Sequence, residues 1–210
     1  MKREFPPLVL ALILIVVCVL FRVISSKYTD YSFNVSPLMA IAFVGAMYLP
    51  RRWGWLVAPV TLVFTELAFL RTNYLTDASG QMISWWTLGN IAFFAAVYAA
   101  ASGFGYLIAR YRSLPLLVAG SLLCSLVFYV ASNTFSWAYD IAIQMPNSYA
   151  PTLAGWWQAN TIGVAGFPPT WLFLRNAMAG DLFFGFLLLL VLDRAFLFGQ
   201  APAKSVPRIA

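Results

Sequence analysis

The chain has 210 residues, of which 62% are hydrophobic and 10% are charged, with a formal net charge of +6 and no histidine. Soluble globular domains are nearer to about 45–50% apolar and about 25% charged, so the composition excludes that class and predicts an all-α membrane protein. In membrane proteins Lys and Arg report orientation, so the positive charge does not indicate nucleic-acid binding.

Six apolar segments are predicted to form transmembrane helices within one domain, residues 1–198. In chain order they are Pro7–Ile24, Pro37–Leu49, Trp55–Leu70, Trp85–Ala109, Leu114–Trp137 and Trp171–Leu192. A spanning helix needs about 20 mostly apolar residues, and the second segment is short by this measure. The long aromatic loop 144–169 favours a short interfacial helix at Leu153–Ile162 and a role as a lid. Residues 199–210 are predicted to be a disordered cytoplasmic tail.

The basic residues favour one orientation of these helices. With a cytoplasmic N-terminus, nine Lys and Arg residues lie on the inner side. The other four lie on the outer side or in the outer half: Arg22, Lys27, Arg71 and Arg175. Because cytoplasmic loops carry the excess of Lys and Arg, the sequence predicts that both termini are cytoplasmic.

In this orientation the polar side chains gather toward the outer side, whereas the inner halves of the helices are almost entirely apolar. The candidates are Asn34, Ser36, Glu66, Asn90, Asn133, Arg175, Asn176 and Asp181. Ionisable groups at membrane depth usually face the bundle interior or a watery cavity. The pattern predicts one outward-opening polar pocket above a sealed floor. The alternative is that Arg175 and Asp181 pair with Glu66 or with backbone carbonyls and only clamp helices together.

Most tryptophans fall near the outer face, and Trp86, Trp137 and Trp157 are candidates for contact with a ligand. They form either an interfacial aromatic belt or flat walls for a ring-bearing ligand.

Stripes of small residues, Ala42/Ala46 and Ala95/Ala99/Gly103, allow close helix packing within the chain or against a membrane partner subunit. Cys18 and Cys124 lie in apolar runs and are predicted to be buried small hydrophobic residues.

An enzyme is the weaker class of function. Glu66 and Asp181 are the carboxylates well inside the bundle, and the chain has no G-x-S-x-G, H-E-x-x-H or aspartate-rich motif. Without histidine, the commonest general base and metal ligand is missing. We therefore expect no catalytic activity, no cofactor and no metal.

Three stretches together resemble an uncharacterised family of small bacterial inner-membrane proteins. They are FNVSPLMAIAFVGAMYLPRR (33–52), SLVFYVASNTFSWAYD (125–140) and LAGWWQANTIGVAGFPPTWLFLRNAMAGDLFF (153–184). That family typically reads N-F-S-P-x-x-A-x-A-x-F-x-G-A, F-x-x-x-N-x-x-x-W and P-x-x-x-N-x-x-x-G-D-L at these places. The matching positions here are Asn34, Ser36, Pro37, Asn133, Trp137, Asn176, Gly180 and Asp181.

The family is similar in architecture to the S components of energy-coupling factor (ECF) transporters, which are six-helix subunits that bind vitamins and metal-ion micronutrients. This resemblance implies an outward-facing pocket in a multi-pass protein of the bacterial inner membrane. It implies a substrate-binding subunit for uptake of a small organic micronutrient, a vitamin or cofactor precursor, with the lipid bilayer and that ligand as partners. The alternative is a non-catalytic accessory or assembly subunit of a larger membrane complex.

Overall fold

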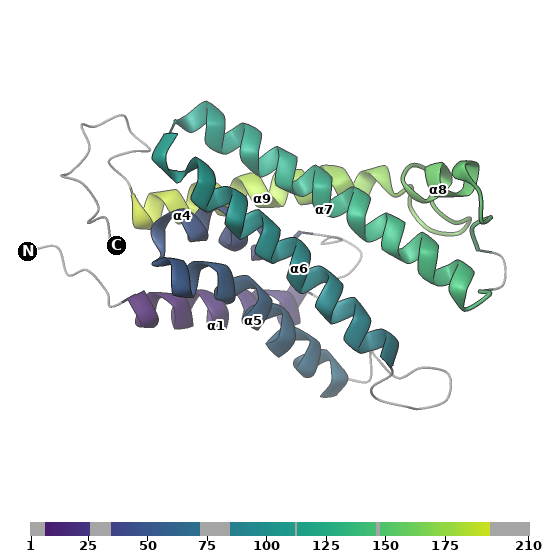
Figure 1. The fold of residues 1–210 in the computed structure, drawn as a ribbon, viewed down its shortest axis with the longest axis horizontal. Coiled ribbons are helices and arrows are strands. Elements are labelled where there is room, and N and C mark those ends of the chain that lie inside the picture. The colour runs from purple at the N-terminus through teal and green to yellow at the C-terminus, as the bar shows by residue number, and fades with distance from the viewer. Residues whose placement is uncertain (1–6, 26–34, 72–84, 112, 146–147, 194–210) are drawn as a thin grey trace, which may run out of the picture.

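The structure is a computed structural model that describes residues 7–25, 35–71, 85–111, 113–145 and 148–193 (Figure 1). Five long helices dominate it: α1 (Pro7–Ser25), α5 (Arg51–Arg71), α6 (Trp85–Ile108), α7 (Leu114–Ala142) and α9 (Trp171–Leu192). The shorter elements are α3 (Leu38–Ala40), η2 (Ile41–Gly45), α4 (Ala46–Tyr48), η3 (Ala109–Tyr111) and α8 (Leu153–Ala159). All regular structure in the described residues is helical, which confirms the all-α prediction.

Among the described residues, four helical stretches are long and apolar enough to cross a membrane: Leu8–Ser25, Leu88–Tyr111, Leu114–Ala142 and Trp171–Leu192. Helix α5 has 21 residues, but its described apolar part, Trp53–Leu67, is shorter. These helices make the chain a helical membrane protein. Six full spans and cytoplasmic termini remain predictions.

The predicted boundaries of α7 and α9 agree closely with the observed ones. Helix α7 begins where predicted because Ser113 accepts a hydrogen bond from the Leu116 backbone N–H at 3.3 Å and Pro115 follows in the first turn. It continues five residues beyond the predicted end, through Asp140, to Ala142. Helix α9 has the predicted bounds, Trp171–Leu192.

The second predicted span is a short helix inside the bundle. Elements α3, η2 and α4 have three, five and three residues and run on without a break, so we call Leu38–Tyr48 the half-helix. At 1.5 Å per residue its length is about 16 Å, half of a hydrocarbon core that is about 30 Å thick. Every residue from Pro37 to Ala46 is buried, so this segment is enclosed by the other helices and has no lipid-facing side.

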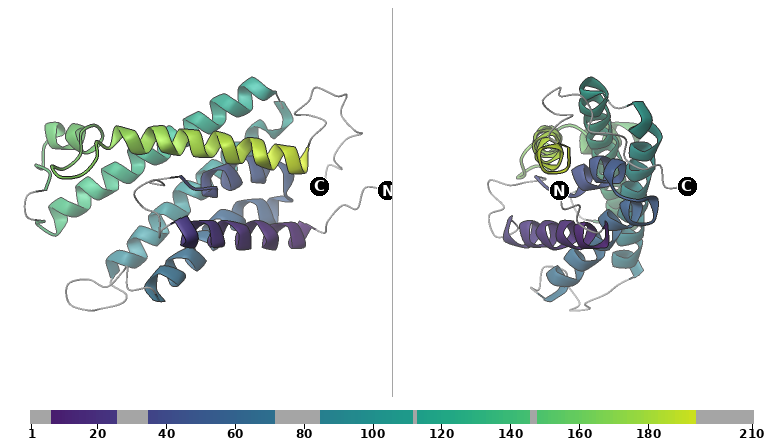
Figure 2. Two further views of the ribbon diagram at one scale, coloured as in Figure 1. Left: turned by 180° about the vertical axis from the view of Figure 1, so that it is seen from behind. Right: turned by 90° about the vertical axis from the view of Figure 1, so that its left-hand side faces the viewer.

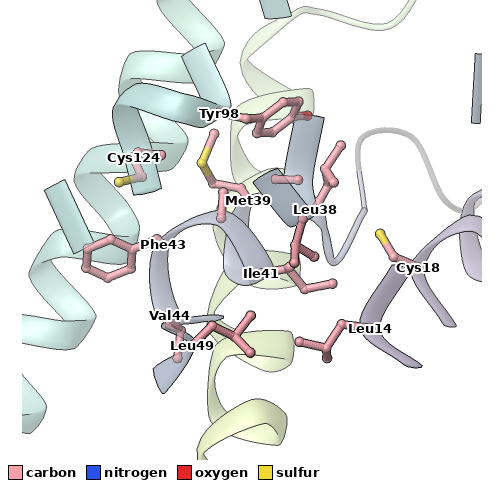
Figure 3. Packing of buried hydrophobic residues seen from close by; sticks show 14 of the residues in the cluster. Leu14, Cys18, Leu38, Met39, Ile41, Phe43, Val44, Leu49, Tyr98 and Cys124 are labelled. Carbon is pink, nitrogen blue, oxygen red and sulfur yellow. The ribbon is translucent and has the colours of Figure 1, made fainter. Parts of the chain in front are cut away.

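Phe43 of the half-helix is one of the buried core residues (Figure 3). Its ring stacks on Phe104 of α6, with ring centroids 5.6 Å apart. A Cβ at Gly105 would overlap the Phe43 carbonyl oxygen, and a Cβ at Gly120 of α7 would overlap its ring. These two glycines therefore let α6 and α7 close around the half-helix. Cys18 also lies in this core, and both it and Cys124 are buried, as predicted.

The long helices run between two ends of the molecule (Figures 1 and 2). Helix α1 packs on α5, α5 on α6, and α7 on both α9 and α8. One end, which we call the basic end, contains Arg51, Arg110, the start of α1 and the last turn of α9. The opposite end contains α8 and the first turn of α9, and we call it the cap end.

Candidate functional site

Asp181 lies in the middle of α9, about 15 Å from Trp171 at 1.5 Å per residue, and is only 4% exposed. Ser125 of α7 donates a hydrogen bond to Asp181 Oδ2 at 2.6 Å. The same hydroxyl lies 3.0 Å from the Ser121 carbonyl oxygen. Because a hydroxyl has one proton, it cannot donate fully to both oxygens. The carboxylate oxygens of Asp181 can therefore accept further hydrogen bonds from a bound group.

A half-open hollow with a free volume of about 20 Å³, room for about one water molecule, lies beside Asp181, between α7, α9 and the half-helix. Ser121 and Asp181 are its polar lining residues. The others are Val44, Leu114, Leu117, Val118, Leu182, Gly185, Phe186 and Leu189. Since Leu114 begins α7 and Leu189 is near the end of α9, the hollow extends from Asp181 toward the basic end. The sequence predicted that the half of the bundle toward the basic end would be apolar and closed. Gly185, which has no side chain, helps to leave this space open.

The start of the half-helix lies next to this point of α9. A Cβ at Gly180 would come within 3.3 Å of a Val35 side-chain carbon and 3.6 Å of the Ser36 backbone nitrogen. Ser36 Oγ accepts a hydrogen bond from the Leu38 backbone N–H at 3.3 Å. The structure therefore places Ser36 of one motif next to Gly180 of another.

Arg175 and Asn176 lie closer to the cap end than Asp181 does. The exposed Arg175 guanidinium donates to Asn176 Oδ1 at 3.2 and 3.3 Å. The expected partner for a helix clamp, Glu66, instead pairs with Arg22 across α1 and α5, with 3.7 Å between nitrogen and oxygen. An arginine within an apolar helix requires a partner, and this was the sequence signal that could have identified Arg22.

The Arg22–Glu66 pair gives a stability prediction. Either single substitution, Arg22→Leu or Glu66→Leu, leaves one mostly buried charge without its partner, which we expect to cost about 1–3 kcal/mol of unfolding free energy. The double variant should melt closer to the wild type than either single variant, as measured by thermal unfolding in detergent. If the double variant lost as much stability as the two single variants together, the two charges would not stabilise each other.

The remaining predicted residues near the cap end mostly hold the chain together. Asn133 donates to the Tyr129 carbonyl of its own helix at 2.9 Å, and Trp137 donates through Nε1 to the Ala150 carbonyl at 3.0 Å. Asn90 is half-buried on α6, and Trp157 is exposed on α8. Asn34 and the side chain of Trp86 lie outside the described residues.

Two contacts that the sequence did not indicate also fasten the loop after α7. Tyr129 donates to the Asn160 carbonyl at 2.7 Å, and Trp156 donates to Thr134 Oγ1 at 2.8 Å. Together with Trp137, these contacts hold α8 against the last turns of α7. A tyrosine or tryptophan in an apolar run carries no sequence signal for such a partner.

The small-residue stripes take different positions. Ala42 and Ala46 are 0% and 1% exposed, so they pack inside the chain and are not available to a partner subunit, contrary to that alternative. Ala95, Ala99 and Gly103 of α6 are half-buried. A partner surface on this second stripe remains a proposal.

Comparison with known proteins gives a family but no activity. No curated protein and no solved structure matches the chain. The profile of the "Family of unknown function (DUF6580)" matches residues 2–199, which is nearly the whole chain. The chain therefore belongs to the DUF6580 family.

Proposed function

We propose that this protein is a substrate-binding membrane subunit for uptake of a small organic micronutrient, and that Asp181 and the adjoining hollow hold part of the substrate. The observation that carries the proposal is a carboxylate buried halfway along a spanning helix, beside a small hollow of about 20 Å³. An ionisable group at this depth is costly and commonly marks a substrate or ion pathway. Binding pockets typically combine apolar walls with a few polar groups, as this hollow does.

The half-helix adds support to this location. Many transporters bind substrate near the bilayer midplane, beside helices that are interrupted there. Here the half-helix begins against Gly180, one residue from Asp181, and contains the π-helical stretch Ile41–Gly45. Such stretches are rare and occur frequently at functional sites.

The lining residues define the chemistry of a matching ligand. Asp181 accepts hydrogen bonds, so the ligand must present a donor or a positive charge, while Val44, Leu117 and Phe186 offer apolar contact. Ligand pockets usually measure about 300–1,000 Å³, so this hollow, at about 20 Å³, must widen by separation of α7 and α9 before it can hold a small molecule. A vitamin or cofactor precursor that carries a donor or a positive charge, as the resemblance to the S components of ECF transporters implies, fits the chemistry of the lining.

The proposal includes an entry route and an orientation. With both termini cytoplasmic in a bacterial inner membrane, the substrate approaches from the cap end, past Arg175, Asn176 and the aromatic loop. Alternating exposure of the site to the two sides then completes uptake. Asn133 and Trp137 belong to this route and not to the hollow itself.

The second candidate, an accessory or assembly subunit, is favoured by a different observation. Polar groups in the helices find partners within the chain, as in the Arg22–Glu66 and Ser125–Asp181 contacts. In that case the polar cluster only stabilises the bundle, and a partner subunit covers the α6 stripe.

Mass spectrometry of small molecules released from the purified protein separates the two candidates. We expect the wild type and the control variant Asp193→Asn to retain one small molecule, and Asp181→Asn to retain at least tenfold less, because its carboxylate charge is lost. Asp193 is a suitable control because it follows the same helix but lies at the basic end. Equal recovery from all three proteins, or no molecule from the wild type, would favour the accessory subunit.

A further inference from the structure

The chain between Asp140 and Arg175 contains no charged residue, although much of it lies outside the spanning helices. Loops that face water normally carry charged or strongly polar residues. We call the described part of this segment that surrounds α8, residues 148–171, the aromatic cap (Figure 1). Its composition is closer to that of a membrane interface than to that of an aqueous loop.

The aromatic cap exposes large apolar side chains. Leu153 is 79% exposed, Phe167 is 74% and Trp157 is 63%, and Ile162 and Trp171 are also exposed. Soluble surfaces rarely gather so many large apolar groups within one short segment, and such a patch marks an interaction site.

Several polar groups in the aromatic cap are satisfied within the cap, although Asn160 Oδ1 is buried without a hydrogen-bond partner. Thr152 caps α8 by accepting from the Gly155 N–H at 3.2 Å. The side chain of Gln158 donates to the Gly163 carbonyl at 3.0 Å, and Thr170 donates to the Thr161 carbonyl at 2.8 Å. Polar groups that are bonded in this way can enter a region poor in water without a large desolvation cost.

Exposed apolar side chains occur both in the cap and along α9. Trp171 is both the end of the cap and the first residue of α9, and it is exposed, as is Phe183 further along α9. Arg175, one turn beyond Trp171, is exposed as well, so α9 carries one charge next to the cap. The cap itself is uncharged and matches the membrane interface in chemistry. The contacts of Tyr129, Trp137 and Trp156 hold the cap at the end of α7.

We propose that the aromatic cap is a membrane-interface anchor, with Leu153, Trp157 and Phe167 inserted at the boundary between lipid headgroups and acyl chains. Since the cap has no charged residue, its insertion depends on apolar burial and not on anionic lipid. This inference is independent of the substrate-binding proposal and of which side of the membrane the cap end occupies.

The test places a fluorophore on an introduced cysteine in the full chain, reconstituted in phosphatidylcholine vesicles. The sites are Leu153→Cys and Phe167→Cys in the cap, with exposed Gln144→Cys as an aqueous control and Phe183→Cys as a lipid-facing control on α9. The native Cys18 and Cys124 are buried, so labelling is directed to the introduced residue. The cap side chains are mostly exposed, so their replacement does not disturb the core.

We expect nitroxide-labelled lipids to quench both cap sites at least twofold more than the Gln144 control, with shallow nitroxides more effective than deep ones. Aqueous iodide should quench the cap sites less than the control, and added phosphatidylglycerol should not change the result. Iodide quenching equal to that of the control, with no lipid quenching, would place the cap in water and overturn the proposal. Protection from both quenchers would mean that a protein covers the cap, which also overturns it.

Discussion

Gly105→Ala is expected to lower the melting temperature of the detergent-solubilised protein by several degrees. The new methyl group would overlap the Phe43 carbonyl oxygen, which belongs to backbone and cannot rotate away. Overpacking of this kind typically costs about 1–3 kcal/mol. Elsewhere in a helix the same change is favourable by about 0.5–1 kcal/mol. Thermal unfolding followed by tryptophan fluorescence measures the difference.

The matched control is Gly103→Ala, two residues earlier on α6. A Cβ at Gly103 meets no atom within 4 Å, so this variant should melt at or above the wild-type temperature. If both variants melted alike, α6 would not approach the half-helix as closely as the structure shows.

Asp181→Leu is expected to lose the bound small molecule while melting at or above the wild-type temperature. Replacing a buried carboxylate with an apolar side chain removes a desolvation cost of about 1–3 kcal/mol. Small-molecule mass spectrometry and thermal unfolding of the same preparation give the two readouts.

Ser125→Ala is the complementary variant. It removes the hydroxyl that donates to Asp181 and leaves the carboxylate buried, so it should destabilise the protein by about 1–3 kcal/mol. The double variant, which also contains Asp181→Leu, should recover most of that loss. The opposite result would be a strongly destabilised Asp181→Leu variant and a Ser125→Ala variant as stable as the wild type. It would show that the carboxylate is a structural clamp, as the accessory-subunit hypothesis requires.

Long uncharged runs and local caps made most of the helices predictable from the sequence. Trp171–Leu192 was predicted with its observed bounds, and Ser113 with Pro115 determined the start of α7. The half-helix was not predictable as such. Its burial depends on Gly105 and Gly120, which lie more than sixty residues further along the chain and offer no local signal.

The candidate site was predictable in part. Asp181 was identified because a carboxylate within an apolar run is costly, and Ser36 because it matched a family motif. Ser125 was missed because a serine within an apolar helix usually bonds to its own backbone, and only the packing of α7 on α9 brings it to Asp181. The outward-opening pocket stays a prediction, and the hollow beside Asp181 had no signal in the sequence. Charge patterns indicate the side of the membrane, whereas a hollow depends on where small side chains from different helices meet.

The most direct test of a binding site at Asp181 is an experimental density map of the protein, purified without added ligand and held in a lipid nanodisc. We expect density for a small molecule in the hollow between α7 and α9, with one of its polar atoms within hydrogen-bond distance of an Asp181 carboxylate oxygen. A hollow that is closed by Leu182 and Phe186, or filled only by a lipid chain that leaves Asp181 bonded to Ser125 alone, would contradict the proposal.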